Sequence, residues 1–419
     1  MKETVKIESM SYGESAIAHL HSGKTAFVRG GIPGEICEIE ILEDKKKYCI
    51  AKKIGADPEL IGAPWAHIVY SNQLEYKRKN VVDALSRHAG LAPDVAENIV
   101  SPCMHSSKEL HYRNKIEFSY INEVLCMYDS LEERYVEVKE LAIANKMLTS
   151  APKSISGALK YINKNNVLGI KRVGLRASTN TGSLEIALYT EPGAFPRHEV
   201  ANVLKSALPA TSIVRVLCSS GNIHRPKGVE VLFGDGFWRE VLGNCKYFVS
   251  APSFFQVNSK CAEILQTLVL DAINTFKCRS VADLYCGCGT FTIPITKQGI
   301  SGCGIELSGS STRDLKRNLK LNNIDADVIC DDVKHAISKI KGADTIVVDP
   351  PKKGIDKDTL SKLIALNIPS IIYVSCDPIT LARDIKALMA SGYKLKSVQP
   401  VDMFPQTYHV ENVAVLGKR

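Results

Sequence analysis

The residue with the clearest chemical potential in this chain is Cys376, in the run VSCDP that follows the apolar stretch IIY. Aspartate is a favoured N-cap and proline suits the first helical position, so a helix is predicted to begin directly after Cys376. The dipole at a helix N-terminus favours the thiolate, which is the nucleophilic form of cysteine. The alternative is a buried, inert cysteine, which is our interpretation of most of the chain's thirteen cysteines. We interpret Cys376 as a candidate nucleophile.

A carboxylate near the C-terminus is the candidate base. Glu411 lies in the run HVEN, just before the last predicted strand. From a strand end, a carboxylate can reach the mouth of a pocket and remove a proton from a substrate. Spacing alone does not exclude a surface glutamate.

A glycine turn is predicted to form a ligand site in the run DLYCGCGT, residues 283–290. A glycine turn between a strand and a helix lets the backbone approach a ligand closely. Glu306 follows Gly289 by seventeen residues, at the end of the next strand, where it can accept hydrogen bonds from ribose hydroxyls. The third glycine of a dinucleotide fingerprint is replaced by Thr292. S-adenosylmethionine carries a ribose but no pyrophosphate, so it fits this pattern better than a dinucleotide.

Two further acids follow predicted strands. Asp332 can meet an adenine amino group, or it can simply cap the next helix. Asp349 begins the run DPPKK, in which two prolines fix a rigid, extended turn. The two lysines that follow suit a phosphate.

The elements that must position these residues form an alternating pattern from about residue 246. Apolar strands alternate with amphipathic helices, which predicts a doubly wound, mainly parallel α/β sheet. Ligands bind beyond the carboxyl ends of the strands in such sheets, and the acids and Cys376 fall at those ends. We expect a domain over residues 246–419.

Residues 56–245 are predicted to form one mixed α+β domain. The stretch 72–90 has helical spacing, 172–190 suggests a hairpin that turns at residues 180–182, and 227–242 suggests another that turns at Asp235 and Gly236. Residues 1–55 contain five short strands with glycine turns, which suits a small barrel of the OB type. Lys45, Lys46 and Lys47 are either a solvated hairpin tip or a phosphate contact in an RNA-binding barrel.

Composition sets limits on the class of protein. A net charge of +8 favours an anionic partner without requiring one. No stretch approaches the roughly 18–20 apolar residues of a membrane span, and the start lacks the apolar core of an export signal, so we expect a cytoplasmic protein with no membrane partner. The odd number of cysteines, without an export signal, argues against a disulfide framework. No CxxC pair occurs, which argues against a structural zinc site and a closely spaced iron–sulfur loop.

Together these motifs resemble one family, the S-adenosylmethionine-dependent RNA uracil-5-methyltransferases of the RumA and TrmA type. The matching runs, in order, are SFFQVN (253–258), DLYCGCGTFTIP (283–294), GIELS (304–308), DPPKKG (349–354), YVSCDPITLARD (373–384) and HVENVAVL (409–416). The resemblance implies a class I, Rossmann-like methyltransferase sheet at the C-terminus. It also implies a central RNA-binding domain and an N-terminal TRAM barrel.

The resemblance also implies residue roles. Cys376 corresponds to the nucleophile and Glu411 to the general base. The positions that line the methyl-donor pocket and the target-base site correspond to Gln256, Tyr285, Thr290, Glu306, Asp332 and Asp349, the place of Asp332 depending on a one-residue gap. Phe254 and Phe255 can support a flipped base, although core packing is expected for at least one of them.

One departure from the family is notable. RumA-type enzymes usually carry four cysteines for an iron–sulfur cluster, three of them clustered after the barrel. The corresponding stretch here, IGAPWAHIVYSNQLEYKRK, contains no cysteine, and neither does ELAIANKML around the fourth position. We therefore expect no iron–sulfur cluster and no metal.

The resemblance implies methylation of carbon 5 of a uridine, and the TRAM-like barrel favours 23S ribosomal RNA as the target. The alternative is the same reaction on the T-loop of tRNA. A third hypothesis, a catalytically inactive RNA-binding module, is disfavoured because Cys376 and Glu411 are both present. We expect a monomer.

Overall fold

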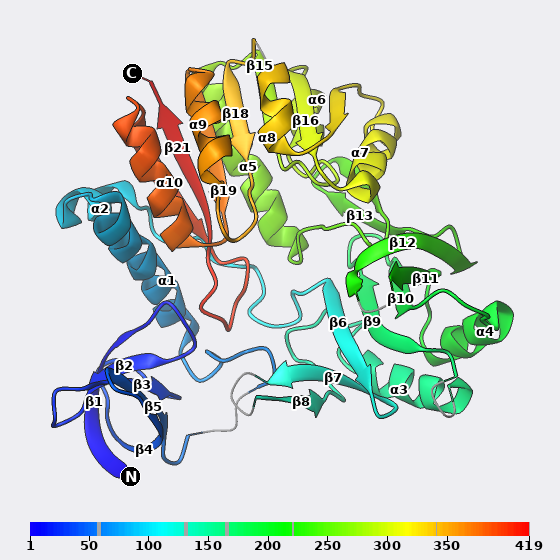
Figure 1. Ribbon diagram of the computed structural model, residues 1–419, viewed down its shortest axis with the longest axis horizontal. Coiled ribbons are helices and arrows are strands. Elements are labelled where there is room, and N and C mark those ends of the chain that lie inside the picture. Colours follow the sequence, from blue (N-terminus) through cyan, green and yellow to red (C-terminus); the bar gives the residue numbers. More distant parts are fainter. Residues whose placement is uncertain (57–59, 130–132, 164–166, 220–221, 341, 419) are drawn as a thin grey trace. The chain divides into compact units, whose positions relative to one another are not determined.

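The protein chain divides into two compact units, each with its own hydrophobic core. Figure 1 labels their helices and strands. The computed structural model describes residues 1–419 except 57–59, 130–132, 164–166, 220–221, 341 and 419. Unit 1 comprises Met1–Glu109, Pro351–Ile355 and Tyr373–Arg419, and unit 2 comprises Leu110–Pro350 and Asp356–Ile372.

Unit 1 begins with a closed five-strand barrel in the order β1-β2-β3-β5-β4. Its strands are β1 (Lys2–Met10), β2 (Ala16–His19), β3 (Thr25–Arg29), β4 (Ile36–Asp44) and β5 (Tyr48–Lys53). Side chains along each strand alternate between the barrel core and solvent. In β1, Val5 and Ile7 face the core. The expected small barrel is confirmed, and Lys45, Lys46 and Lys47 lie at the tip between the antiparallel strands β4 and β5.

Helical segments follow the barrel in unit 1. These are α1 (Tyr70–Ala84), the π-helical turn η1 (Leu85–Ala89) and α2 (Pro93–Ile99). The helical prediction for residues 72–90 is confirmed, and Gly90, with a φ of 78°, ends it.

A seven-stranded, mostly antiparallel sheet forms the first part of unit 2, in the order β12-β11-β10-β9-β6-β7-β8. The strands are β6 (Lys115–Ile121), β7 (Val124–Asp129), β8 (Arg134–Glu137), β9 (Ile170–Ala177), β10 (Leu184–Thr190), β11 (Ser212–Ser219) and β12 (Asn222–Phe233). The helices α3 (Ala151–Ile162) and α4 (Arg197–Ala207) accompany it. The mixed α+β fold is confirmed, and β9 and β10 form the expected antiparallel pair.

The second expected hairpin is wrong in its pairing. The chain does turn at Asp235 and Gly236, but β12 pairs with β11, whereas β13 (Trp238–Leu242) pairs with β14 (Cys245–Val249) in a separate sheet. A Cβ on Gly234 would lie 2.1 Å from the carbonyl oxygen of Thr211, so this turn packs closely against the residue before β11. A turn signal predicts that the chain reverses, and long-range packing decides which strand each arm pairs with.

The α/β sheet begins in unit 2 with β17, β16, β15 and β18 in that order, followed by residues 370–372 of β19. These strands are β15 (Ser280–Leu284), β16 (Ser301–Glu306), β17 (Asp327–Cys330), β18 (Thr345–Val348) and β19 (Ser370–Ser375). The helical segments are α5 (Ser259–Phe276), α6 (Thr292–Lys297), α7 (Gly309–Leu321), α8 (Val333–Ala336), the 3-10 turn η3 (Ile337–Lys339) and α9 (Lys357–Ala365). The pairs of β15 with β16 and β18, and of β16 with β17, are parallel.

Unit 1 contains residues 373–375 of β19 and continues the strand order with β21 (Glu411–Gly417) and β20 (Lys394–Val401), which are antiparallel to each other. The helix α10 (Pro378–Ala390) follows β19. The doubly wound, mainly parallel sheet is therefore confirmed, whereas the sequence analysis did not identify α5. Among the described residues, no helix is long and apolar enough to cross a membrane.

Candidate active site

The candidate nucleophile lies in unit 1 between a strand and a helix. Cys376 directly follows β19 and is partly exposed. Asp377 caps α10 by accepting hydrogen bonds from the backbone N–H groups of Ile379 at 3.1 Å and Thr380 at 2.9 Å, and Pro378 is the first helical residue. The predicted cap is confirmed, so the cysteine lies at the positive end of a thirteen-residue helix, where a thiolate is favoured.

A barrel tyrosine that the sequence analysis missed contacts this loop. The Tyr12 hydroxyl lies 3.3 Å from the Cys376 carbonyl oxygen and 3.4 Å from Oδ2 of Asp377, as a hydrogen-bond donor to both. Burial, followed by the negative charge of Asp377, raises the pKa of Tyr12, so the hydroxyl stays protonated. No local sequence signal could have indicated this contact, because Tyr12 and Cys376 are 364 residues apart.

The candidate base begins the neighbouring strand. Glu411 is the first residue of β21 and is 3% exposed. The side-chain amide of Asn412 donates a hydrogen bond to the carbonyl oxygen of Ser375, the last residue of β19, at 3.2 Å. This bond holds the start of β21 beside the end of β19. Glu411 directly precedes Asn412, and Cys376 directly follows Ser375. Unit 1 therefore brings the two predicted catalytic residues to the same end of these two strands.

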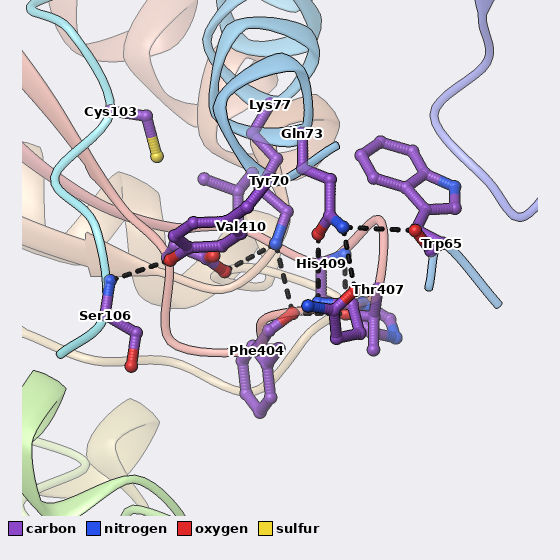
Figure 2. Close-up of polar contacts among 12 residues, drawn as sticks. Trp65, Tyr70, Gln73, Lys77, Cys103, Ser106, Phe404, Thr407, His409 and Val410 are labelled. Atoms are coloured by element: carbon purple, nitrogen blue, oxygen red, sulfur yellow. Dashed lines mark hydrogen bonds and ion pairs between the residues drawn. The ribbon is translucent and has the colours of Figure 1, made fainter. Parts of the chain in front are cut away.

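Buried polar residues of α1 hold the segment before Glu411 (Figure 2). Lys77 donates from Nζ to Oδ1 of Asp402 at 2.5 Å and to the carbonyl oxygen of Phe404 at 3.0 Å. The side chains of Gln73 and Gln406 are 2.8 Å apart, and Gln73 also accepts from the Gln406 backbone at 3.0 Å. Lys77 and Asp402 are fully buried, so α1 fixes the loop of residues 402–410.

The glycine turn of unit 2, which was predicted to form a ligand site, has an unusual backbone conformation. Gly287 and Gly289 have φ values of 54° and 94°, and a Cβ on Gly289 would lie 2.5 Å from Leu315. Tyr285 has a φ of 62°, a conformation that residues other than glycine rarely adopt. The turn therefore requires glycine, and it carries strain of the kind that concentrates at ligand sites.

Glu306 is fixed at the end of β16 by two backbone groups. Its two carboxylate oxygens accept hydrogen bonds from the N–H of Gly287 at 3.0 Å and of Ser308 at 2.6 Å. The carboxylate is thus attached to the glycine turn and to the residue that caps α7. A carboxylate in this position suits ribose hydroxyls.

Two buried acids lie near the ends of β15 and β18, Asp283 one residue before the end of β15 and Asp349 directly after β18. Burial raises the pKa of Asp283 to about 7 and the pKa of Asp349 to about 7. The negative charge of Asp283 contributes further to the raised pKa of Asp349. One oxygen of Asp283 accepts from the Thr292 hydroxyl at 2.5 Å, while the other is buried with no hydrogen-bond partner in the described part of the chain. Gln256 donates to Asp349 at 3.3 Å. A buried carboxylate oxygen without a hydrogen-bond partner in the described residues, beside the glycine turn, fits a polar or cationic ligand.

The remaining predicted residues have distinct places in unit 2. Thr290 is 9% exposed, in the same glycine turn as Tyr285. Asp332 caps α8 by accepting from the N–H of Lys334 at 2.9 Å, which matches the alternative reading of this residue as a helix cap. Phe255 is 2% exposed and contacts Trp238 and Tyr247, whereas Phe254 is 61% exposed. Phe255 is therefore a core residue, and only Phe254 presents a free ring surface.

The other cysteines of the fold contrast with Cys376. Cys286 and Cys288 pack in a core cluster, and burial raises the pKa of the Cys288 thiol to about 12. All thirteen cysteines are free thiols. Among the described residues, no group of three or more His, Cys, Asp or Glu side chains is placed to hold a metal ion.

Comparison with known proteins identifies the class. Residues 2–54 match the TRAM domain, and residues 69–419 match the model of the tRNA (uracil-5-)-methyltransferase family. With this family match and its fold, the protein is an S-adenosylmethionine-dependent RNA methyltransferase that acts on carbon 5 of uracil. The chain belongs to the tRNA (uracil-5-)-methyltransferase family.

Relatives match along almost the whole chain. An uncharacterized RNA methyltransferase of Gloeobacter violaceus is 31% identical over 452 residues, which cover 99% of this chain and 96% of that protein. An uncharacterized RNA methyltransferase of Clostridium tetani is 31% identical over 427 residues and covers 94% and 91%. The crystal structure of Pyrococcus abyssi tRNA (uracil-54, C5)-methyltransferase in complex with S-adenosyl-L-homocysteine matches with a TM-score of 0.79 and 25% identity, over 99% of each chain. The expected family, fold, methyl donor and RNA substrate are thereby confirmed.

Proposed function

We propose that the protein methylates carbon 5 of a specific uridine through a covalent bond between Cys376 and carbon 6 of the base. Carbon 5 of uracil is a poor nucleophile. Addition of the Cys376 thiolate to carbon 6 places an electron pair on the ring as an enolate, which makes carbon 5 nucleophilic. The observation that most supports this role is the partly exposed cysteine at the start of α10, beside the strand that begins with Glu411.

Glu411 completes the cycle as the base in this proposal. After carbon 5 has gained a methyl group it still carries its original hydrogen. The Glu411 carboxylate removes that proton, the carbon 5–carbon 6 double bond re-forms, and the thiolate of Cys376 leaves. A base within folded RNA must first rotate out of its stack, and the exposed ring of Phe254 is a candidate support for it.

The residues of unit 2 hold the methyl donor in this proposal. S-adenosylmethionine supplies a methyl group that its sulfonium makes electrophilic. Glu306 binds the ribose hydroxyls, Tyr285 and Thr290 border the glycine turn, and Gln256 and Asp349 act together because they are hydrogen-bonded. Asp332 is proposed to contact the adenine in addition to capping α8.

The proposed target is 23S ribosomal RNA, because the chain begins with a TRAM barrel. The T-loop of tRNA is a second candidate. A specific observation favours it, since the match to the Pyrococcus abyssi tRNA enzyme extends over 99% of both chains and so includes the barrel. A barrel shared with a tRNA enzyme is weak evidence for a ribosomal target.

A transfer assay tests the reaction and its target. Purified protein is incubated with radiolabelled S-adenosylmethionine and either 23S RNA or tRNA transcripts, and the products are digested to nucleosides. We expect 5-methyluridine in one of the two RNAs. Incorporation into neither would contradict the proposed activity, and incorporation into tRNA alone would replace the ribosomal target.

Substitution of the nucleophile tests the covalent step. We expect Cys376→Ala to abolish methyl transfer while the affinity for S-adenosylmethionine is unchanged. The matched control is Cys330→Ala, which changes the exposed cysteine at the end of β17 and should leave transfer intact. Residual turnover by the Cys376→Ala variant would exclude the covalent mechanism.

Substitution of the base should trap the intermediate. Glu411→Gln keeps the size of the side chain but cannot accept the carbon 5 proton. We expect a methylated protein–RNA adduct that survives denaturing electrophoresis. Free turnover without an adduct would show that another group acts as the base.

Four further expectations belong to this proposal. They are a three-part domain organisation with boundaries near residues 55 and 245, a cytoplasmic location, a monomer, and a fold that needs no iron–sulfur cluster. The visible absorption spectrum of protein purified without oxygen tests the last one, since stoichiometric iron and a brown colour would contradict it.

A further inference from the structure

Unit 2 contains a concave site beside the proposed donor site. A cavity of about 590 Å³ lies between the end of β12, the turn that follows it and the start of α7. We name it the β12–α7 groove, and its defining residues are Lys227, Val229, Val231, Phe237, Ser308 and Arg313. The elements α7 and β12 are labelled in Figure 1.

The charge of the groove is positive. Its acids are already compensated, because Asp314 pairs with Arg317 at 2.6 Å and Asp235 pairs with Arg239. Lys227 and Arg313 are both exposed, and neither forms an ion pair with any residue in the described part of the chain. Two uncompensated cations in one concavity favour a polyanionic ligand.

The rest of the lining suits a nucleotide better than a simple anion. Val229 and Val231 are 39% and 51% exposed, which is unusual for valines in a strand. Phe237 is held in place, with the Arg317 guanidinium 4.0 Å from its ring centroid and Phe248 stacked at 6.0 Å. Apolar side chains beside cations match the ribose and base of a nucleotide together with its phosphate.

Ser308 connects the groove to the proposed donor site. Ser308 lines the groove, and its backbone N–H donates to the Glu306 carboxylate at 2.6 Å. The Ser308 side chain caps α7 by accepting from the N–H of Ser311. An RNA strand held in the groove would therefore run close to the Glu306 side of the donor site.

We propose that the β12–α7 groove binds a single-stranded segment of the substrate RNA. Lys227 and Arg313 contact its phosphates, and Val229 and Val231 contact a ribose and a base. This inference rests on the proposed function for the identity of the RNA. In this proposal the groove binds the RNA and sets which nucleotide reaches the active site. The groove takes no part in the chemical step.

The test is the double variant K227Q/R313Q, which replaces both cations by neutral amides. Both side chains are exposed, so folding should be unaffected. The control is K316Q, which removes an exposed cation that lies on α7, as Arg313 does, but outside the groove. Binding is measured by fluorescence anisotropy over a range of salt concentrations. The probes are the unmodified transcript that serves as substrate in the transfer assay and a short oligouridine.

We expect the double variant to bind RNA roughly tenfold more weakly than the control. The slope of log affinity against log salt should fall by about 1.4, because two phosphate contacts on a single strand are lost. The KM for RNA should rise, while kcat at saturating RNA and the affinity for S-adenosylmethionine stay unchanged. V231E should also weaken RNA binding, since it places a negative charge in the groove.

An affinity and a salt slope equal to those of K316Q would overturn the inference. A double variant that binds RNA normally but loses a co-purifying protein would also overturn it, and would reassign the groove to a protein partner. The two proposals fail separately. If the wild-type protein methylates no RNA, the proposed function is wrong. The oligouridine measurement still shows whether the β12–α7 groove binds single-stranded RNA.

Discussion

At the scale of single residues, the local setting of a side chain decides whether its functional group can react. The chain has thirteen free cysteines, and Cys376 is the one that directly precedes the cap of the thirteen-residue helix α10 while remaining partly exposed. Cys288 illustrates the opposite case, because its burial holds the proton on its thiol. Reactivity therefore depends on the surroundings of the sulfur.

Tyr12 is expected to position the Cys376 loop. The variant Tyr12→Phe keeps the ring and removes only the hydroxyl, which donates to the carbonyl of Cys376. The loss of about 1 kcal/mol of hydrogen bonding should lower the rate of adduct formation about fivefold. The measurement is single-turnover adduct formation, and the affinity for S-adenosylmethionine should not change.

The matched control for Tyr12 is Tyr48→Phe, on another part of the same barrel, which should behave as wild type. If both variants form adduct at the wild-type rate, Tyr12 has no positioning role. If Tyr12→Phe lowers the melting temperature and the rate in parallel, its role is structural.

The acids Asp283 and Asp349 should make donor binding depend on pH. Both have a pKa raised to about 7, so both are mostly ionised at pH 8 and mostly protonated at pH 6. Ionised carboxylates attract the cationic sulfonium of S-adenosylmethionine, so its affinity should rise between pH 6 and pH 8. S-adenosyl-L-homocysteine, whose sulfur is neutral, should respond less. Calorimetric titration at both pH values checks this, and an equal response of the two compounds would contradict it.

The same two acids affect stability with a defined sign. Their pKa values in the folded chain exceed the unfolded values, so the folded chain binds these protons more tightly. Their stabilisation is complete below the unfolded pKa of about 4 and is lost as the pH rises through about 7. Asp283→Asn should therefore flatten the decline of the unfolding free energy over this range, as measured by urea titration.

At the scale of elements, α1 carries a buried ion pair that holds the loop before β21. Lys77→Met would leave Asp402 as a buried, uncompensated charge, which costs about 3–5 kcal/mol. The control Lys79→Met breaks the exposed pair with Asp83 on the same helix and should cost about 0–1 kcal/mol. Chemical denaturation measures both. Equal losses for the two variants would show that burial of the Lys77 pair does not matter.

The pairing of β12 and β13 shows the limit of local signals at this scale. The turn at Asp235 and Gly236 was predicted, but its two arms belong to different sheets. This separation has a structural consequence, because the turn itself then lines the β12–α7 groove. A simple hairpin would have paired the two arms with each other.

At the scale of the whole molecule, the barrel is part of the core of unit 1. Its core cluster includes Trp65 and Ile68, which lie beyond the last barrel strand. Trp65 also donates from its ring to Gly13 and from its backbone to Gln406. The barrel, the segment after it and the loop before Glu411 therefore form one packed body within unit 1.

Deletion of residues 1–55 should consequently harm more than RNA binding. It removes the partners of Trp65 and Ile68 and the hydroxyl of Tyr12, so we expect lower stability and exposed apolar surface. Dye binding and thermal denaturation of the truncated chain measure this effect. A truncated chain with the melting temperature of the full chain would show that the barrel folds independently of the rest of unit 1.

The local parts of this protein could be predicted from its sequence. The cap at Asp377, the glycine turn, the five barrel strands and the alternation of strands and helices were all foreseen, because each depends on residues close together in the chain. The helix cap formed by Asp332 was foreseen as an alternative for the same reason.

Folding in three dimensions added the contacts between distant residues. Tyr12 contacts the Cys376 loop across 364 positions, and Lys77 contacts Asp402 across 325. The raised pKa values of Asp283 and Asp349 come from burial, which no short run of residues reveals. These features depend on which surfaces pack together, and tertiary packing is not encoded in the spacing of neighbouring residues.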